Sequence, residues 1–286
     1  MDHLPPRHRV EVDVQYDVLM AQIGPGATKP KWRSIALPVE HGGWGFTIEP
    51  ALLGLLVAPS PAAWELAVAS LAVFLSRRPV KLVLTDILRR RWLERTTVAA
   101  IFGAIYGAIA LAGAVGAVVT ADASFWPPLV MALPFAAVAL YADAHSQSRT
   151  LVAELSGAVA MGATVSMIAL ADGWEMASAL GLWLVLAGRA VATIVLVRAQ
   201  IRRVHGRPSQ SAAVYAVQAA TVVTLAVAAT ADVIPWASVS ALAAIGVLAY
   251  WSLTRPPVAA KVVGWTQIVV GLFVVLSTAV GVWIDW

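Results

Sequence analysis

The sequence predicts an all-α, polytopic integral membrane protein. Its 286 residues are 60% hydrophobic and only 13% charged, and the mean hydropathy is +0.79. Soluble domains average about half apolar and about a quarter charged residues. About nine long apolar segments follow one another along the chain, and basic residues gather in alternate connections between them. These three observations favour a bundle of transmembrane helices.

The chain divides into a cytoplasmic N-terminal tail, residues 1–37, and a transmembrane helical bundle, residues 38–286. Residues 10–17 alternate like a short strand, but the tail as a whole is expected to be disordered or to lie on the surface. Residues 1–7 lack the apolar stretch of a signal peptide. The chain has no cysteine, which excludes disulfides and thiolate chemistry.

A spanning helix needs about 20 apolar residues. The predicted segments are 41–58, 62–77, 97–119, 126–142, 150–171, 175–199, 212–231, 235–253 and 262–284. The second and fourth segments are short, and Pro127, Pro128 and Pro134 disturb the fourth. Seven or eight spans therefore remain open alternatives to nine.

The connections predict the orientation, because Lys and Arg mark the cytoplasmic side of a membrane protein. Bases occupy the tail, residues 77–95, Arg149, residues 198–207 and residues 255–261, and the intervening connections have none. We therefore expect a bacterial inner (plasma) membrane protein with the N terminus inside, the C terminus outside and an odd number of spans. This topology explains the pI near 9.7 without a nucleic-acid partner. Tryptophans that suit the outer boundary are Trp64, Trp126, Trp174, Trp236, Trp283 and Trp286.

Residues 79–95 have the pattern of an amphipathic helix that lies in the inner interface, where anionic headgroups would attract it. The alternative is a binding role for the same region. Arg77, Arg78 and Lys81 would then hold a phosphate or carboxylate, with Asp86 balancing or orienting them.

Polar residues also occur inside the apolar segments, where they are costly unless they face protein or water. Glu49 lies near the middle of the first segment. The cytoplasmic halves of later segments contain Glu154, Arg189, Thr193, Gln218 and Gln267. This similar depth favours a polar cavity open to the cytoplasm, to which Arg198 and Arg202 would contribute. The alternative is a structural ion pair of Arg189 with Glu154 or Glu49.

His41 is the best candidate acid or base, because histidine titrates near neutrality, and Glu49 is the second catalytic candidate. Asp143 and His145 could contribute to a metal site, but a metal needs three or four ligands. Residues 143–149 are better interpreted as a solvated loop, and no metal site is predicted. The sequence has no HExxH, Walker or GxSxG motif.

The run Glu40-His41-Gly42-Gly43-Trp44, together with the arrangement around Arg77, Pro79 and Lys81, resembles the YwiC-like family of bacterial membrane proteins. The resemblance extends over residues 35–285. It implies a membrane protein and no particular activity or cofactor, so the cofactor stays unknown.

The predicted arrangement is also similar to that of UbiA-type prenyltransferases, which have nine helices and Asp-rich motifs at the second-to-third and sixth-to-seventh connections. In that family the aspartates bind Mg²⁺ and diphosphate. Here the first region has the single carboxylate Asp86, and residues 198–207 have none. Because a Mg²⁺ site needs carboxylates, the similarity implies a UbiA-like bundle and no shared catalytic residues.

The sequence thus predicts a cytoplasm-facing basic cavity that binds an anionic lipid or isoprenoid-type ligand bearing phosphate or carboxylate, in contact with membrane lipids. A transporter or flippase of an anionic substrate, or a structural protein without catalysis, are the alternatives. The predicted ligand-binding residues are Arg77, Arg78, Lys81, Asp86, Glu154, Arg189, Arg198 and Arg202.

Overall fold

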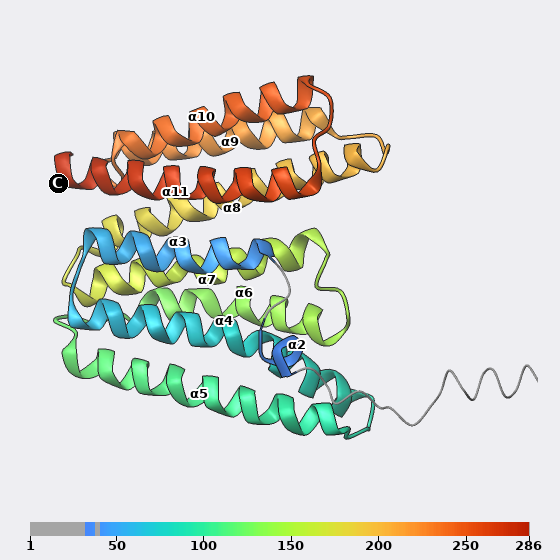
Figure 1. Ribbon diagram of the computed structural model, residues 1–286. Helices are drawn as coiled ribbons and strands as arrows, with labels where there is room; N and C mark the ends of the chain where they lie inside the picture. Colours follow the sequence, from blue (N-terminus) through green and yellow to red (C-terminus); the bar gives the residue numbers. More distant parts are fainter. Residues whose placement is uncertain (1–31, 38–40, 286) are drawn as a thin grey trace, which may run out of the picture.

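A computed structural model describes residues 32–37 and 41–285, and over these ranges helices joined by short connections are the regular secondary structure (Figure 1). The helices are α2 (Trp32–Ala36), α3 (His41–Val57), α4 (Pro61–Leu88), α5 (Glu94–Thr120), α6 (Trp126–Ala144), α7 (Leu151–Ala171), α8 (Met176–Val204), α9 (Ser211–Thr230), α10 (Trp236–Thr254) and α11 (Ala260–Asp285). The predicted all-α class is confirmed for this part of the chain. The strand predicted for residues 10–17 lies outside the described residues.

Seven of the described helices, α5 to α11, are long and apolar enough to cross a membrane. Helix α3 has 17 residues, and α4 has 28 residues but includes the bases Arg77, Arg78 and Lys81. The chain is therefore a polytopic membrane protein with seven candidate spans in its described part. Crossing by α3 and α4, which would raise the count to nine, stays a prediction.

The prediction of a separate interfacial helix over residues 79–95 is wrong. Helix α4 continues through Pro79 to Leu88, a turn follows, and α5 begins at Glu94. Proline usually interrupts a helix because it lacks an N–H group. Here Pro79 is buried and faces Gly103 of α5, where even an added Cβ would lie 3.8 Å from the proline ring. Packing against α5 thus accommodates the proline inside one long helix.

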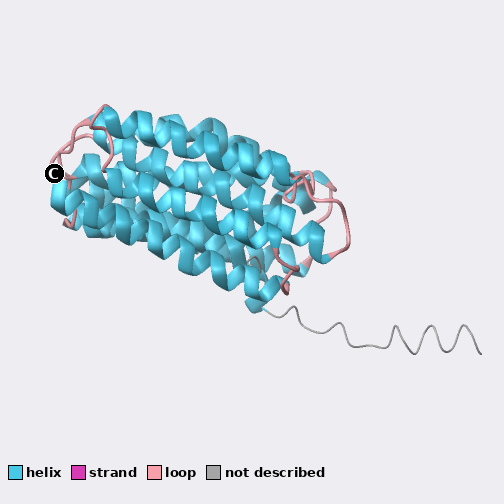
Figure 2. Cartoon of the chain, turned by 90° about the horizontal axis from the view of Figure 1, so that it is seen from above, coloured by secondary structure: helices cyan, strands magenta, loops and turns pink. Residues whose placement is uncertain are grey.

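The helices lie side by side, and the loops gather at the two ends of the bundle (Figures 1 and 2). We call the end with the α4–α5, α6–α7, α8–α9 and α10–α11 connections the base-rich end, and the opposite end the acid-rich end. Asp122, Asp172 and Asp232 lie in connections of the acid-rich end. Exposed tryptophans near that end are Trp64, Trp126, Trp236 and Trp283.

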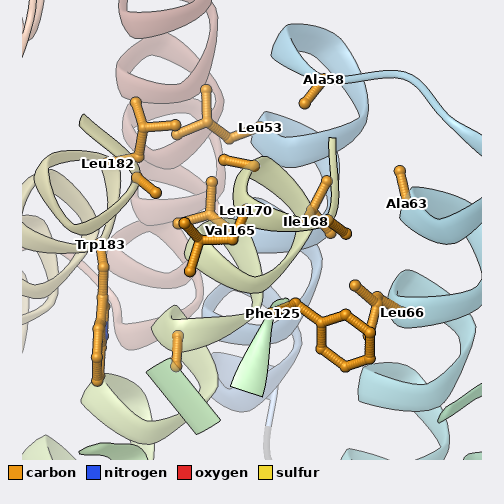
Figure 3. Packing of buried hydrophobic residues seen from close by; sticks show 14 of the residues in the cluster. Leu53, Ala58, Ala63, Leu66, Phe125, Val165, Ile168, Leu170, Leu182 and Trp183 are labelled. Carbon is orange, nitrogen blue, oxygen red and sulfur yellow. The ribbon is translucent and has the colours of Figure 1, made fainter. Parts of the chain in front are cut away.

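Helix α3 lies near the middle of the bundle, in contact with α4 and α7 on one side and α8 and α11 on the other. The half of α3 nearer the acid-rich end packs into an apolar cluster in which Leu53 meets Ile168 of α7 and Leu182 of α8 (Figure 3). Gly54 allows the close approach, because a Cβ there would lie 2.7 Å from the Ile168 side chain. In lipid, such contact of small residues favours helix association. The apolar core therefore fills the acid-rich half around α3.

Candidate functional site

A buried ion pair joins α3 to α8. Glu49 Oε1 lies 2.7 Å from Arg189 Nη2, and the two side chains are 9% and 3% exposed. The same Nη2 donates to the main-chain oxygen of Gln267 on α11 at 3.0 Å, and the guanidinium lies over the Phe46 ring at 5.1 Å from its centre. Of the two partners predicted for Arg189, Glu49 makes the contact.

Small residues make room for this pair. A Cβ at Gly271 of α11 would overlap both the Glu49 carboxylate and the Arg189 guanidinium, and one at Gly45 would lie 3.0 Å from Glu49 Oε1. A charge at this depth is costly without a partner, and removing one member of a buried pair leaves the other uncompensated. The pair therefore fixes how α3, α8 and α11 meet.

A second polar cluster lies at the base-rich end, where α4 meets the end of α6. Arg77 donates from Nε and Nη2 to Asp143 at 2.6 and 3.1 Å. Lys81 Nζ lies 3.7 Å from the same carboxylate and donates to Ser148 Oγ at 2.7 Å. The prediction that Asp143 belongs to a solvated loop is wrong, because α6 extends to Ala144 and its last turn turns this side chain, 2% exposed, toward α4.

Arg198 of α8 reaches the same region from the other side. Its Nη1 donates to Glu154 Oε2 at 2.8 Å and to the main-chain oxygen of Arg149 at 3.1 Å. The α6–α7 loop, residues 145–150, is thus held by Lys81 from α4 and by Arg198 from α8. Arg149 in this loop is exposed.

Asp86 forms a third cluster, which closes the turn between α4 and α5. Its buried carboxylate accepts from Arg91 Nε at 2.8 Å, Arg95 Nη2 at 3.0 Å and Thr96 Oγ1 at 2.7 Å. These hydrogen bonds, above all those from Arg95 and then Thr96, hold the pKa of Asp86 well below its usual range. Asp86 therefore orients bases that follow it in the chain and does not contact Arg77 or Lys81.

The remaining predicted residues lie apart from these clusters. Arg78 donates to the main-chain oxygen of Ser34 in α2, and Arg202 donates to that of Pro208 at 3.0 Å. Helix α3 begins at His41, whose side chain lies outside the described part of the structure. The predicted binding residues thus fall into several groups. One of these groups lies around the α6–α7 loop and the adjoining helix ends, and its members are Arg77, Lys81, Glu154 and Arg198.

Within the described residues, no three His, Cys, Asp or Glu side chains gather as they would around a metal. His145 stacks on Tyr141 with ring centres 4.1 Å apart, and its Nδ1 lies 2.9 Å from the Tyr141 main-chain oxygen. An open pocket of 440 Å³ lies between α3, α8 and α11 at the acid-rich end, away from the base clusters. Its lining residues are Val57, Trp174, Glu175, Ser178, Val282 and Trp283.

The first part of the bundle, from the end of α2 to the last turn of α7, is similar to a known protein family. Residues 37–169 match the YwiC-like protein family. This confirms the predicted resemblance over that range, which includes Glu49 and Asp143. Arg189, the partner of Glu49, lies beyond the matched residues. No curated protein and no solved structure matches the chain.

Proposed function

We propose that this YwiC-like protein binds an anionic lipid or isoprenoid-type ligand, bearing phosphate or carboxylate, at its base-rich end. The observation that carries the proposal is the gathering of Arg77, Lys81, Arg149 and Arg198 around the α6–α7 loop. The carboxylates that the structure brings to these bases are Asp143 and Glu154. The bases exceed the acids, and the loop region carries a net positive charge.

The geometry of these bases suits a headgroup. The side chains of Arg77, Lys81 and Arg198 are 31%, 32% and 41% exposed, so each is reachable while a carboxylate holds its orientation. Guanidinium groups bind phosphate and carboxylate through paired hydrogen bonds. Anionic lipids add a long-range attraction for basic segments at the membrane surface.

The test measures ligand binding to the purified protein by native mass spectrometry. Phosphatidylglycerol is compared with phosphatidylcholine, and inorganic pyrophosphate serves as a soluble probe of the same anionic chemistry. Arg77→Lys and Arg198→Lys keep the charge but lose the paired hydrogen bonds, and each should weaken phosphatidylglycerol binding about tenfold, ~1.4 kcal/mol.

Arg207→Lys, in the exposed α8–α9 connection, is the matched control and should leave binding unchanged. Preference for pyrophosphate alone would point to a soluble ligand. Equal binding of both lipids, or equal losses in Arg198→Lys and Arg207→Lys, would contradict a site at the α6–α7 loop.

The proposal includes a UbiA-like arrangement in the bacterial inner membrane, with the base-rich end in the cytoplasm. Support comes from the nine described helices of 17 residues or more, α3 to α11, and from the bases at one end. If the protein is an enzyme, His41 is its proposed acid or base. His41→Ala should then abolish turnover and spare binding, and full activity of this variant in cells would remove the catalytic role.

Transport of an anionic substrate is the second candidate function, and the buried Glu49–Arg189 pair favours it. Ionisable pairs at this depth occur along substrate and proton pathways. Proteoliposomes distinguish the candidates, because a transporter moves a labelled anion across the bilayer whereas a binding protein leaves it on one side.

A further inference from the structure

A set of buried polar atoms without partners lies between the base-rich end and the Glu49–Arg189 pair. Within the described residues, buried side-chain atoms that lack a hydrogen-bond partner are Arg189 Nε, Thr193 Oγ1, Gln200 Oε1, Gln218 Oε1 and Gln267 Oε1. They come from α8, α9 and α11, and Arg189, Thr193 and Gln218 are nine-tenths buried or more. From these atoms we infer that water enters the bundle at the base-rich end and reaches the ion pair along α8, forming a hydrated half-channel.

The positions on α8 give the half-channel its direction. Arg189, Thr193 and Gln200 fall within about 40° of one another around the helix, at 100° per residue. They are spread along the helix from its middle toward the base-rich end at Val204. This face therefore presents polar groups from the interface to the depth of the ion pair.

Helices α9 and α11 supply the facing groups. Gln218 of α9 donates from Nε2 to the main-chain oxygen of Ala192, which brings this side chain to the depth of Thr193 and leaves its Oε1 unpartnered. Gln267 of α11 presents its main-chain oxygen to Arg189, and its side-chain Oε1 is also unpartnered. Three helices thus direct polar groups toward the same region.

Water is the ligand that this chemistry selects. Three of the five atoms are amide oxygens, which accept hydrogen bonds, one is the Thr193 hydroxyl, which can donate or accept, and the fifth is an N–H donor. A buried polar group without a partner costs about 1–3 kcal/mol, and buried water commonly bonds to such groups. An anion would meet three amide oxygens here, and Glu49 already balances the charge of Arg189, so an anion is disfavoured.

The half-channel ends at a charged pair, so it could carry protons to Glu49. Within the described residues, Arg189 is the charged group that faces Glu49. A file of water that ends at a carboxylate is an arrangement by which protons reach buried sites in membrane proteins. Beyond the pair, toward the acid-rich end, α8 enters the apolar cluster that contains Leu182 and Leu186, whose side chains offer water no hydrogen bond.

Cysteine accessibility tests the inference directly, because the native chain has no cysteine and needs no background substitutions. Single variants Thr193→Cys, Gln200→Cys and Gln218→Cys are reconstituted in nanodiscs and treated with a charged, water-soluble methanethiosulfonate. The matched controls are Ile194→Cys and Leu182→Cys. Ile194 is adjacent to Thr193 but packs in an apolar cluster. Leu182 lies on nearly the same side of α8 as Arg189 and Thr193, but beyond the ion pair toward the acid-rich end.

The cysteines at the three half-channel positions, 193, 200 and 218, should react at least about tenfold faster than both controls. A buried apolar site excludes the reagent and suppresses formation of the thiolate. Labelling of Thr193→Cys and Gln218→Cys as slow as that of Ile194→Cys would overturn the half-channel. Fast labelling of Leu182→Cys would replace it with a path that continues past the pair. If Thr193→Cys does not elute as a folded protein in size exclusion, Gln218→Cys decides the result. No anionic ligand takes part, so failure here leaves the proposed lipid site untouched.

Discussion

At the residue scale, the ion pair between Glu49 and Arg189 has the clearest structural consequence. Both side chains are almost completely buried, and the guanidinium bonds both the carboxylate of α3 and a main-chain oxygen of α11. Two charges in this environment are tolerated because each compensates the other. The stability of the bundle should therefore depend on both residues together and not on each alone.

A double-mutant cycle measures this dependence. Glu49→Gln and Arg189→Met should each lower the free energy of unfolding by about 3–5 kcal/mol, because each leaves a buried polar or charged group without its partner. The double variant should lose less than the sum of the two. Reversible unfolding in detergent, followed by circular dichroism, gives the three differences. Strictly additive losses would exclude direct coupling across the pair.

The sequence could predict that Arg189 has an acidic partner, because an unpaired guanidinium at that depth is too costly. It could not choose between Glu49 and Glu154, since the choice depends on how far each lies from Arg189 across the bundle. The structure pairs Glu154 with Arg198, about two and a half turns nearer the base-rich end along α8. Asp143 was misjudged for a related reason, because α6 extends two residues beyond its apolar run and buries the carboxylate against α4.

At the scale of elements, Asp86 joins the end of α4 to the start of α5. Its pKa is lowered by hydrogen bonds from Arg95, Thr96 and Arg91, so the folded state prefers the ionised carboxylate. A depressed folded pKa stabilises the protein above the unfolded pKa of about 3.9, and that contribution is lost as the pH falls below it.

Asp86→Asn should therefore be less stable than the native protein at neutral pH. The gap between the two melting temperatures should narrow as the pH is lowered from about 5 to 3, where the unfolded chain takes up the proton. Glu94→Gln, an exposed carboxylate-to-amide change in the first turn of α5, is the control and should show a smaller loss. A gap that stays constant down to pH 3 would mean that ionisation of Asp86 does not stabilise the turn.

Apolar runs predicted most helix bounds to within a few residues, because twenty apolar residues in succession have few alternatives to a spanning helix. The connection between α4 and α5 was not predictable in this way. The amphipathic pattern of residues 79–95 is real, but Pro79 packs against α5 and lets α4 continue. That contact joins residues 24 positions apart, so local sequence could not show it.

At the scale of the whole molecule, the charges divide the bundle into two ends. Alternate connections carry the bases, and the structure brings those connections together at one end although they are far apart in sequence (Figure 1). The sequence therefore predicted which loops share an end. It could not establish whether α3 and α4 cross the membrane, because α3 is short and α4 carries charges near its end.

Reporter fusions decide the number of crossings and the orientation together. Fusions at Ser60, Ala123, Gly173 and Asp232, in connections of the acid-rich end, should report the periplasm, and those at Arg91, Ser146 and His205 should report the cytoplasm. The physical reason is that bases retained on the cytoplasmic side fix the orientation of short loops. Ser60 is the informative position, because it lies between α3 and α4 and reads as periplasmic only if both helices cross. A cytoplasmic signal at Ser60 with unchanged signals elsewhere would reduce the count to seven, whereas a cytoplasmic C terminus would contradict an odd number of spans.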